Sequence, residues 1–424
     1  MRQIARVILA LQPVVLVVLI AATWLLSYQA RMPWLLLYVP VLIARLIDQR
    51  RLWVRTPLDI PLLALLLLAN INHLITPFTW GWEMSGRITF GIVIVQLLTD
   101  IGRGRRAFSV LLLATGVLTL GVGLLALVSS QWIGKSSALL TIAQAMPVWK
   151  QFPGAEGGFN VNEIGGALAW FVPFAFALLI SAWSKRLHAG LYGVGFAAVA
   201  LAIALGQSRM AIAGVLVVLF AQAALLIPRR RWKVAVCAGI VVLMLLEIGL
   251  VAGVFDTATN DAAGIALNER DEQSASMRLD IWSTGLRAVT NYPITGIGIN
   301  KFRAADFRDA GYAVPSYPER NPPHAHNELL HVTLDLGLPG LLAYVSLHVA
   351  LVWCLWQVWR GGDVRLRGVA VAVAGGLLAH AIFGLADAVT LADRWIWAFW
   401  WLVGLGAAVY VQHKQTVPRD QHLT

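Results

Sequence analysis

Charged residues are scarce in this chain. Asp, Glu, Lys and Arg make up 13% of its 424 residues, whereas 58% are hydrophobic. A soluble protein of this length cannot bury so many apolar side chains, because its core grows too slowly with chain length. The composition therefore excludes a soluble enzyme or binding protein, and it requires lipid as part of the solvent.

Cysteine is scarcer still, and acidic residues are outnumbered by basic ones. Cys237 and Cys354 both lie inside apolar runs, which excludes a disulfide framework and a thiolate metal site. The net charge of +11 does not indicate a nucleic-acid partner, because the basic residues form short clusters between apolar runs and no continuous face. No small-residue cleavage site follows the first apolar run, which we therefore expect to be a retained span.

Long apolar runs are abundant, and they predict an all-α polytopic membrane protein with about 12 transmembrane helices. The predicted spans are 7–28, 33–47, 59–76, 87–102, 107–129, 163–182, 188–206, 209–228, 233–254, 338–359, 367–390 and 395–412. With both termini in the cytoplasm, every short basic cluster falls on the cytoplasmic side, as the positive-inside rule requires.

This topology divides the chain into three parts. Residues 1–253 contain spans 1–9, and residues 254–337 form a long, partly helical outer loop that ends in the candidate catalytic motif. Residues 338–424 contain spans 10–12 and a cytoplasmic tail. In a bacterial inner membrane the outer loop would face the periplasm.

The sequence that ends this loop carries the strongest candidate for chemistry. Two prolines precede His324-Ala-His326-Asn327-Glu328, which reads as a helix start capped by His326 or Asn327. The positive end of a helix dipole disfavours imidazolium, so His326 would stay able to accept a proton as a general base. The alternative is a cap without chemistry, and His324 and His331 are more often structural than catalytic.

Three other polar helix starts fall on the same predicted side. Ser208 and Arg209 open the span after a tight turn and offer an anion site, although Arg209 could simply snorkel to the interface. Arg278 begins a helix on which Leu279, Trp282, Leu286 and Val289 are spaced like one face; it would point to the packed side, or pair with Asp280 or Glu272. Asn162-Glu163 opens the sixth span.

The histidines and Glu328 also raise the possibility of a metal site. The zinc-helix pattern His-Glu-x-x-His is absent, because Asn327 precedes Glu328. His326 and His331 are five residues apart and diverge around a helix. We therefore expect no metal and no cofactor.

Taken together, these motifs resemble the O-antigen ligase and polymerase superfamily. His326-Asn327, nine residues and then Gly337-x-x-Gly340 fit its His-Asn-x9-Gly-x-x-Gly pattern. The Ser208-Arg209 turn, the Asn162-Glu163 span start, and Arg278 followed by Asn291-Tyr-Pro-Ile-Thr-Gly-Ile-Gly298 are similar to the rest of its signature. The resemblance covers roughly residues 160–345 in motif and the entire chain in topology.

The resemblance implies a GT-C-like, metal-independent, inverting glycosyltransferase whose donor is a glycan on undecaprenyl diphosphate. Arg209 and Arg278 would hold the diphosphate, and His326 would take the proton of the acceptor hydroxyl. His324, Asn327, Glu328, Asn162, Arg303 and Arg320 are possible supporting residues.

An O-antigen ligase, with lipid A–core as acceptor, is favoured over an O-antigen polymerase and a protein-O-oligosaccharyltransferase. A lipid-linked glycan transporter would scatter its charges along a midplane cavity, whereas here the polar groups gather at one face.

Overall fold

The structure is a computed structural model that describes residues 1–25, 32–76, 78, 83–132, 142, 145–149, 152, 155–181, 186–251 and 262–416. The C-terminal ends of the predicted spans 7–28, 163–182 and 233–254, the first residues of the predicted outer loop, and the end of the predicted cytoplasmic tail (417–424) lie outside these residues.

The described chain is all-α apart from one two-stranded parallel pair, β1 (Ser130–Gln131) with β2 (Phe159–Asn160). The helices of its first half are α1 (Arg2–Ala10), α2 (Gln12–Leu25), η1 (Pro33–Tyr38), α3 (Val39–Gln49), α4 (Asp59–Ile75), α5 (Glu83–Ile101), α6 (Arg105–Ser129), α8 (Val161–Ser181) and α9 (Arg186–Gly206). Those of its second half are α10 (Arg209–Leu226), α11 (Arg230–Val251), α12 (Ala262–Asn291), η2 (Lys301–Arg303), α13 (Ala305–Phe307), η3 (Arg308–Tyr312), α14 (Glu328–Gly361), α15 (Val364–Phe383), η4 (Arg394–Ile396) and α16 (Trp397–Thr416).

The chain is a multi-pass membrane protein. In its described residues, eight helices are long and apolar enough to cross a membrane, and the bent pair α1–α2 would make a ninth. Pro13 contributes to this bend, because it has no N–H to continue the hydrogen bonding of α1. The all-α class is confirmed, whereas the count of 12 spans and the three-part division remain predictions.

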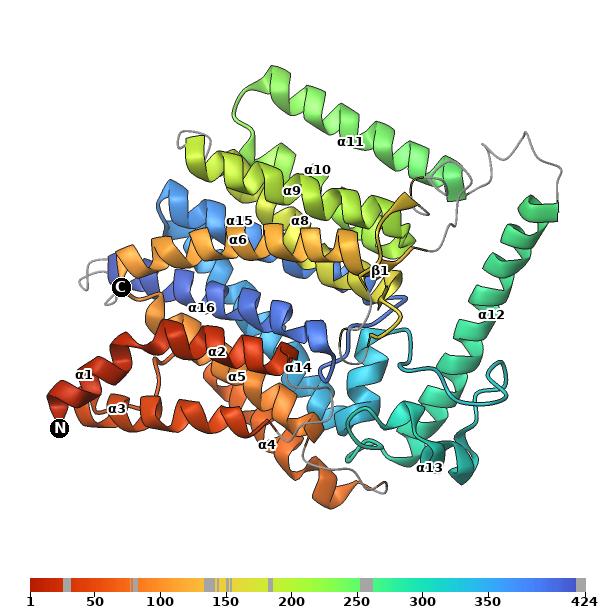
Figure 1. Ribbon diagram of the computed structural model, residues 1–424, viewed down its shortest axis with the longest axis horizontal. Coiled ribbons are helices and arrows are strands. Elements are labelled where there is room, and N and C mark those ends of the chain that lie inside the picture. The colour runs from red at the N-terminus through yellow and green to blue at the C-terminus, as the bar shows by residue number, and fades with distance from the viewer. Residues whose placement is uncertain are drawn as a thin grey trace.

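The long helices run side by side as a bundle, with α12 inclined steeply across one end of it (Figure 1). Helix α16 lies inside the bundle, and all its residues from Trp397 to His413 are buried. The start of α1 and the end of α16 lie at the opposite end of the bundle from α12 and α13 (Figure 1).

One predicted span is wrong at its end. The run 367–390 predicted a single helix, but α15 stops at Phe383 and residues 384–393 form a non-helical connection to η4. The run is apolar enough to resemble a span because these connecting residues are themselves mostly buried. Hydropathy reports burial and not helix geometry, so it could not locate this end.

The Gly337 motif joins two distant segments. Helix α14 kinks at Gly337, whose φ of 69° favours glycine, and a Cβ there would lie 2.2 Å from the carbonyl oxygen of Ile294. Around the kink, Leu338 N–H donates to Pro293 O (2.7 Å) and Ile297 N–H donates to Leu334 O (2.7 Å). The Gly337 kink thereby fixes the segment after α12 against α14.

Candidate active site

Four helix ends meet at the end of the bundle that carries α12. A Cβ on Gly165 would touch Ser208 at 2.8 Å, which places the start of α10 beside the start of α8. The His380 ring bonds Gly166 O (2.9 Å), and Glu328 N–H donates to Gly384 O (2.8 Å), so the end of α15 joins the starts of α8 and α14. The starts of α8, α10 and α14, three of the four predicted polar helix starts, therefore lie together in the structure. The fourth prediction is wrong, because Arg278 lies in the interior of α12, which begins at Ala262.

His326 is the last residue before the cap of α14 and has a left-handed φ of 48°. Asn327 is the cap: its Oδ1 accepts the Leu330 N–H (2.9 Å), and its Nδ2 donates to Leu385 O (3.0 Å). Asn327 thus ties α14 to the 384–393 connection. His326 projects from this junction, with its side chain 20% exposed.

Asp387, in the same connection, is the partner of His326. Its Oδ1 lies 3.1 Å from His326 Nδ1 and also accepts the Ala388 N–H (2.9 Å). Burial alone would raise the pKa of Asp387, but the hydrogen bond from His326 and the charges of His324 and His326 outweigh burial and hold this pKa below its usual value. With Nδ1–H donated to an anionic Asp387, the Nε2 of a neutral His326 has no hydrogen and can accept a proton.

His324 lies against the same pair but is poorly suited to be the base. Its Nδ1 accepts the His326 N–H (3.3 Å) and lies 3.7 Å from Asp387 Oδ1. Burial, together with the charges of His326 and Arg303, lowers the pKa of His324 to about 4 despite the opposing charge of Asp387. A group with this pKa is a weak proton acceptor at neutral pH.

The lowered pKa of His324 predicts an acid-sensitive fold. An unfolded imidazole takes up a proton near pH 6.5 and the folded one only near pH 4, so stability contributed by His324 is complete above pH 6.5 and is lost as pH falls towards 4. The loss amounts to at most about 3 kcal/mol. Asp387 adds no slope in this window, because its stabilising effect is lost only below its ordinary pKa.

The check is thermal unfolding in detergent at pH 7 and pH 4.5 for the wild type and for His324→Asn. The drop in melting temperature between the two pH values should be smaller in the variant. His188→Gln, at the start of α9, should retain the wild-type drop. An equal drop in melting temperature in the wild type and in His324→Asn would show that protonation of His324 does not cause the acid sensitivity.

Glu328 lies beneath the junction and does not face the site. It is buried, its Oε2 is 2.8 Å from His380 Nε2 of α15, and Tyr344 donates its hydroxyl to Oε1. His380 in turn stacks on Trp170. The pair clamps the first turn of α14 to the last turn of α15, and so fixes His326 relative to Asp387.

His331 is structural as well. Its Nδ1 accepts the Ala325 N–H (3.3 Å), and its Nε2 lies 3.6 Å from Asp335, whose Oδ1 accepts the Asn300 N–H (2.8 Å). These contacts hold the loop before His326 against α14.

Arg278 faces the site from the interior of α12. Its Nε is buried and has no hydrogen-bond partner among the described residues. The charges of Arg278 and Asp387 both interact with the Tyr317 hydroxyl. One turn further along α12, Trp282 donates to Ala325 O (3.1 Å) beside His326. A buried guanidinium nitrogen with no partner favours an anionic ligand at this position.

The predicted apolar face of this helix is wrong in part. Leu279 and Leu286 are 64% and 58% exposed, whereas Ile281 and Ala288 are fully buried. The buried stripe is displaced because α12 packs through small residues: a Cβ on Gly285 would meet Leu330 at 3.1 Å.

The remaining predicted residues lie at the same end of the bundle with different neighbours. Arg209 is exposed at the start of α10, and its charge interacts with Glu247 of α11. Arg303 lies close enough to His324 and Glu163 for their charges to interact. Arg320 is exposed on the loop, and Asn162 lies in the first turn of α8, where its N–H donates to Asn160 Oδ1 (2.8 Å).

A metal ion would find three potential ligands here. One ligand atom each from His324, His326 and Asp387 lie within 4.8 Å of one another. The set differs from the one considered in the sequence, which combined the histidines with Glu328, because Glu328 points into the bundle. The hydrogen bond between His326 and Asp387 accounts for their approach without an ion.

The metal-independent transfer that the resemblance implies should survive EDTA, because Asp387 holds His326 by a hydrogen bond that needs no ion. The measurement is transfer by purified protein with and without chelator. Loss of activity that added divalent metal restores would contradict this expectation and assign the three residues as ligands.

Asp387 and Tyr317 were missed in the sequence. Asp387 fell inside a predicted span, and its only signal was a lone acidic residue in an apolar run, which in a membrane protein marks a functional position by default. Tyr317 lies in the loop before α14, and no sequence pattern distinguishes it from the other residues of that loop.

The comparison with protein families agrees with the motifs. Residues 194–345 match the family model described as O-antigen ligase, a stretch that contains Arg209, Arg278 and His326 but neither Asn162 nor Asp387. The search of curated proteins found no match to the chain. Over residues 194–345 the chain is thus similar to the O-antigen ligase family, as the resemblance of its motifs had indicated.

Proposed function

We propose that this protein is an O-antigen ligase that transfers a glycan from undecaprenyl diphosphate to a sugar hydroxyl of lipid A–core. The observation that carries the proposal is the His326–Asp387 pair, which leaves Nε2 of His326 free to accept a proton at the same bundle end as Arg278. The domain match over residues 194–345 supports lipid-linked glycans as the substrate class.

The proposed reaction is a direct displacement. His326 Nε2 takes the proton of the acceptor hydroxyl as its oxygen bonds to the anomeric carbon of the donor sugar. The bond from that carbon to the diphosphate oxygen breaks, and its electron pair leaves with undecaprenyl diphosphate. The anomeric centre is therefore inverted, and the anionic Asp387 stabilises the imidazolium that forms.

The leaving diphosphate requires positive charge. Arg278, whose Nε is buried without a described partner, is the first candidate. Arg209 would approach the donor from the start of α10, after exchanging its interaction with Glu247 for the diphosphate. Arginines held by packed helices, Arg278 within α12 and Arg209 at the start of α10, stabilise charge that develops on the leaving group, and they require no metal ion.

The site would face the periplasm of a bacterial inner membrane. The start of α1 and the end of α16 lie at the other end of the bundle, which is consistent with cytoplasmic termini (Figure 1).

The second candidate is an O-antigen polymerase, because the same His326 chemistry would serve a lipid-linked repeat as acceptor. Purified protein should be supplied with lipid-linked glycan, with and without lipid A–core. Transfer to core supports the ligase, whereas a longer lipid-linked chain without core supports the polymerase. Transfer to a protein hydroxyl would indicate an oligosaccharyltransferase, and movement of the lipid across a bilayer without transfer would indicate a transporter.

A further inference from the structure

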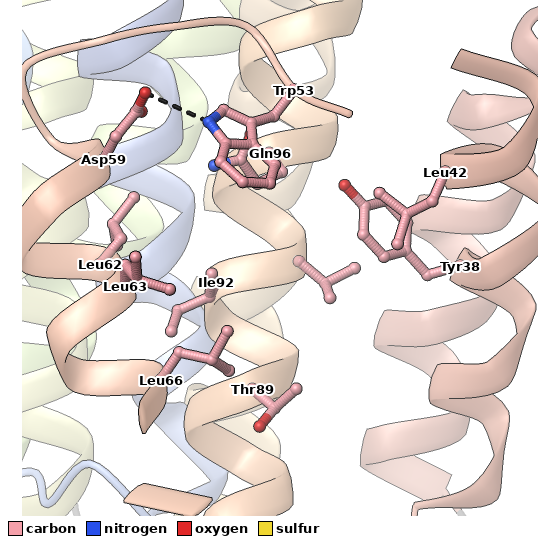
Figure 2. A pocket seen from close by; sticks show the side chains of 11 residues that line it. Tyr38, Leu42, Trp53, Asp59, Leu62, Leu63, Leu66, Thr89, Ile92 and Gln96 are labelled. Atoms are coloured by element: carbon pink, nitrogen blue, oxygen red, sulfur yellow. Dashed lines mark hydrogen bonds between the residues drawn. The ribbon is translucent and has the colours of Figure 1, made fainter. Parts of the chain in front are cut away.

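A separate cavity of about 260 Å³ lies between α3, α4 and α5. Its walls are apolar: Leu62 and Leu66 come from α4, Ile92 and Val93 from α5, and Leu42 from α3. Figure 2 shows Trp53, Asp59 and Gln96 at one end of this cavity, and Leu66 and Thr89 at the other. The cavity is smaller than the roughly 300–1,000 Å³ of pockets for drug-sized ligands, so it suits a single slender chain.

The cavity lies towards the other end of the bundle from the candidate active site. Asn72, near the end of α4, bonds Thr295 O (3.2 Å) and Asp335 O (3.0 Å), which belong to the active-site end. Asp59 is the first residue of the same 17-residue helix, about 20 Å from Asn72 along its axis. The cavity has no part in the proposed reaction.

The cavity opens onto the hydrocarbon-facing surface of the bundle. Leu63 lines it and is 49% exposed. Leu67, one turn further along α4, and Ile43, which follows the lining residue Leu42 on α3, are 54% and 53% exposed. In a multi-pass membrane protein such leucines and isoleucines face lipid. What can enter from this side is therefore a lipid chain.

The end of the cavity near Gln96 and Asp59 contains a hydrogen-bond acceptor that lacks a donor among the described residues. Gln96 lines it, and its Oε1 is buried without a partner among the described residues. Asp59 beside it is already engaged: it accepts from Trp53 Nε1 (3.2 Å) and from Thr56 Oγ1 (2.8 Å). The buried Arg45, which donates to Gln96 O (3.3 Å), has its charge offset by Asp100 at 3.2 Å. The carboxylate of Asp59 therefore favours a cationic donor to Gln96 over a neutral one.

The loop at this end also supplies positive charge. Arg50 and Arg55 are exposed between α3 and α4, and Arg55 lies two residues after Trp53. An unmet acceptor beside a carboxylate, with exposed guanidiniums on the adjacent loop, is complementary to a head group that carries an ammonium and a phosphate.

We propose that this cavity binds one acyl chain of a phosphatidylethanolamine molecule, whose ammonium group donates to Gln96 and whose phosphate lies against the arginines of the loop between α3 and α4. The bound lipid would fill the space between α3 and the α4–α5 pair.

The test is lipid retention by the delipidated, purified full-length protein, measured by native mass spectrometry after incubation with phosphatidylethanolamine, phosphatidylglycerol or polyprenyl phosphate. The wild type should retain one phosphatidylethanolamine in preference to the other two lipids. Val93→Trp fills the cavity and should lower the retained fraction about tenfold. The free energy that corresponds to a tenfold loss is smaller than the free energy gained by burying a lipid chain, so excluding the chain is sufficient to produce it. Leu67→Trp, on the lipid-facing surface of α4 outside the cavity, is the matched control and should retain the lipid.

Gln96→Leu tests recognition of the head group separately from binding of the acyl chain. This variant should still bind one lipid but lose about tenfold of its preference for phosphatidylethanolamine over phosphatidylglycerol, because a hydrogen bond to a charged donor is removed. Thermal unfolding of each variant identifies any that fails to fold. Wild-type retention by a folded Val93→Trp, or equal binding of the three lipids by the wild type, would overturn the proposal.

Discussion

Replacing His326 by alanine is expected to abolish glycan transfer, and replacing Asp387 by asparagine to lower kcat by about 10²–10⁴-fold. The first change removes the proton acceptor. The second retains the shape of the partner but loses its negative charge, so the tautomer with the hydrogen on Nδ1, which leaves Nε2 able to accept a proton, is no longer favoured and the imidazolium is no longer stabilised. Initial rates of transfer from lipid-linked glycan to lipid A–core in liposomes measure both effects.

Two controls distinguish catalysis from folding. His324→Asn should retain most of the activity at pH 7, because the lowered pKa of His324 and the bond that its Nδ1 accepts make it a poor base. All three variants should insert and give single unfolding transitions in detergent. Near-normal transfer by a folded His326→Ala would remove this residue from the mechanism, and an inactive His324→Asn with an active His326→Ala would exchange their roles.

Truncating Arg278 to alanine should lower kcat/KM roughly 100-fold, since a charge-assisted hydrogen bond contributes about 1.5–3 kcal/mol and Arg278 can make two of them to a diphosphate. Its Nε is buried, has no described partner and is held by a helix that packs against the His326 loop. Arg278→Lys should recover only part of the loss, because an ammonium cannot bind the diphosphate in a bidentate manner.

Arg320→Ala is the matched control, because this arginine is exposed on the same outer loop. It should change kcat/KM by less than about threefold, as expected for a solvent-exposed charge. Donor affinity measured separately, with undecaprenyl diphosphate as the probe, should fall in Arg278→Ala and not in Arg320→Ala. Unchanged donor affinity in Arg278→Ala would exclude its diphosphate role.

The clamp beneath the site also has a practical consequence for such experiments. Glu328 and His380 are both buried, and removal of one partner of a buried charged pair typically costs 3–5 kcal/mol. A loss of activity in a Glu328 variant would therefore report the position of the α14 start as much as any chemistry. This clamp is the reason to treat Glu328 as a positioning residue.

Local chemistry in the sequence determined much of the site. The prolines, Asn327 and Gly337 gave the start and the break of α14, because capping and a positive φ depend on the residue itself and its nearest neighbours. The apolar runs likewise indicated most of the bundle, since a residue that faces lipid must be apolar wherever it lies in the chain. Arg209, Arg278 and His326 all lie at one end of the bundle, as the order of spans required.

Tertiary structure alone decided what these residues meet. Asp387 lies 61 positions from His326, and their contact exists only because Asn327 and Glu328 tie the start of α14 to the end of α15. The same packing turned Glu328 inward, exposed Leu279 and Leu286, and ended α15 before the apolar run ended. Each of these outcomes depends on which helix lies alongside, and a pattern of residues along one segment carries no information about its neighbour.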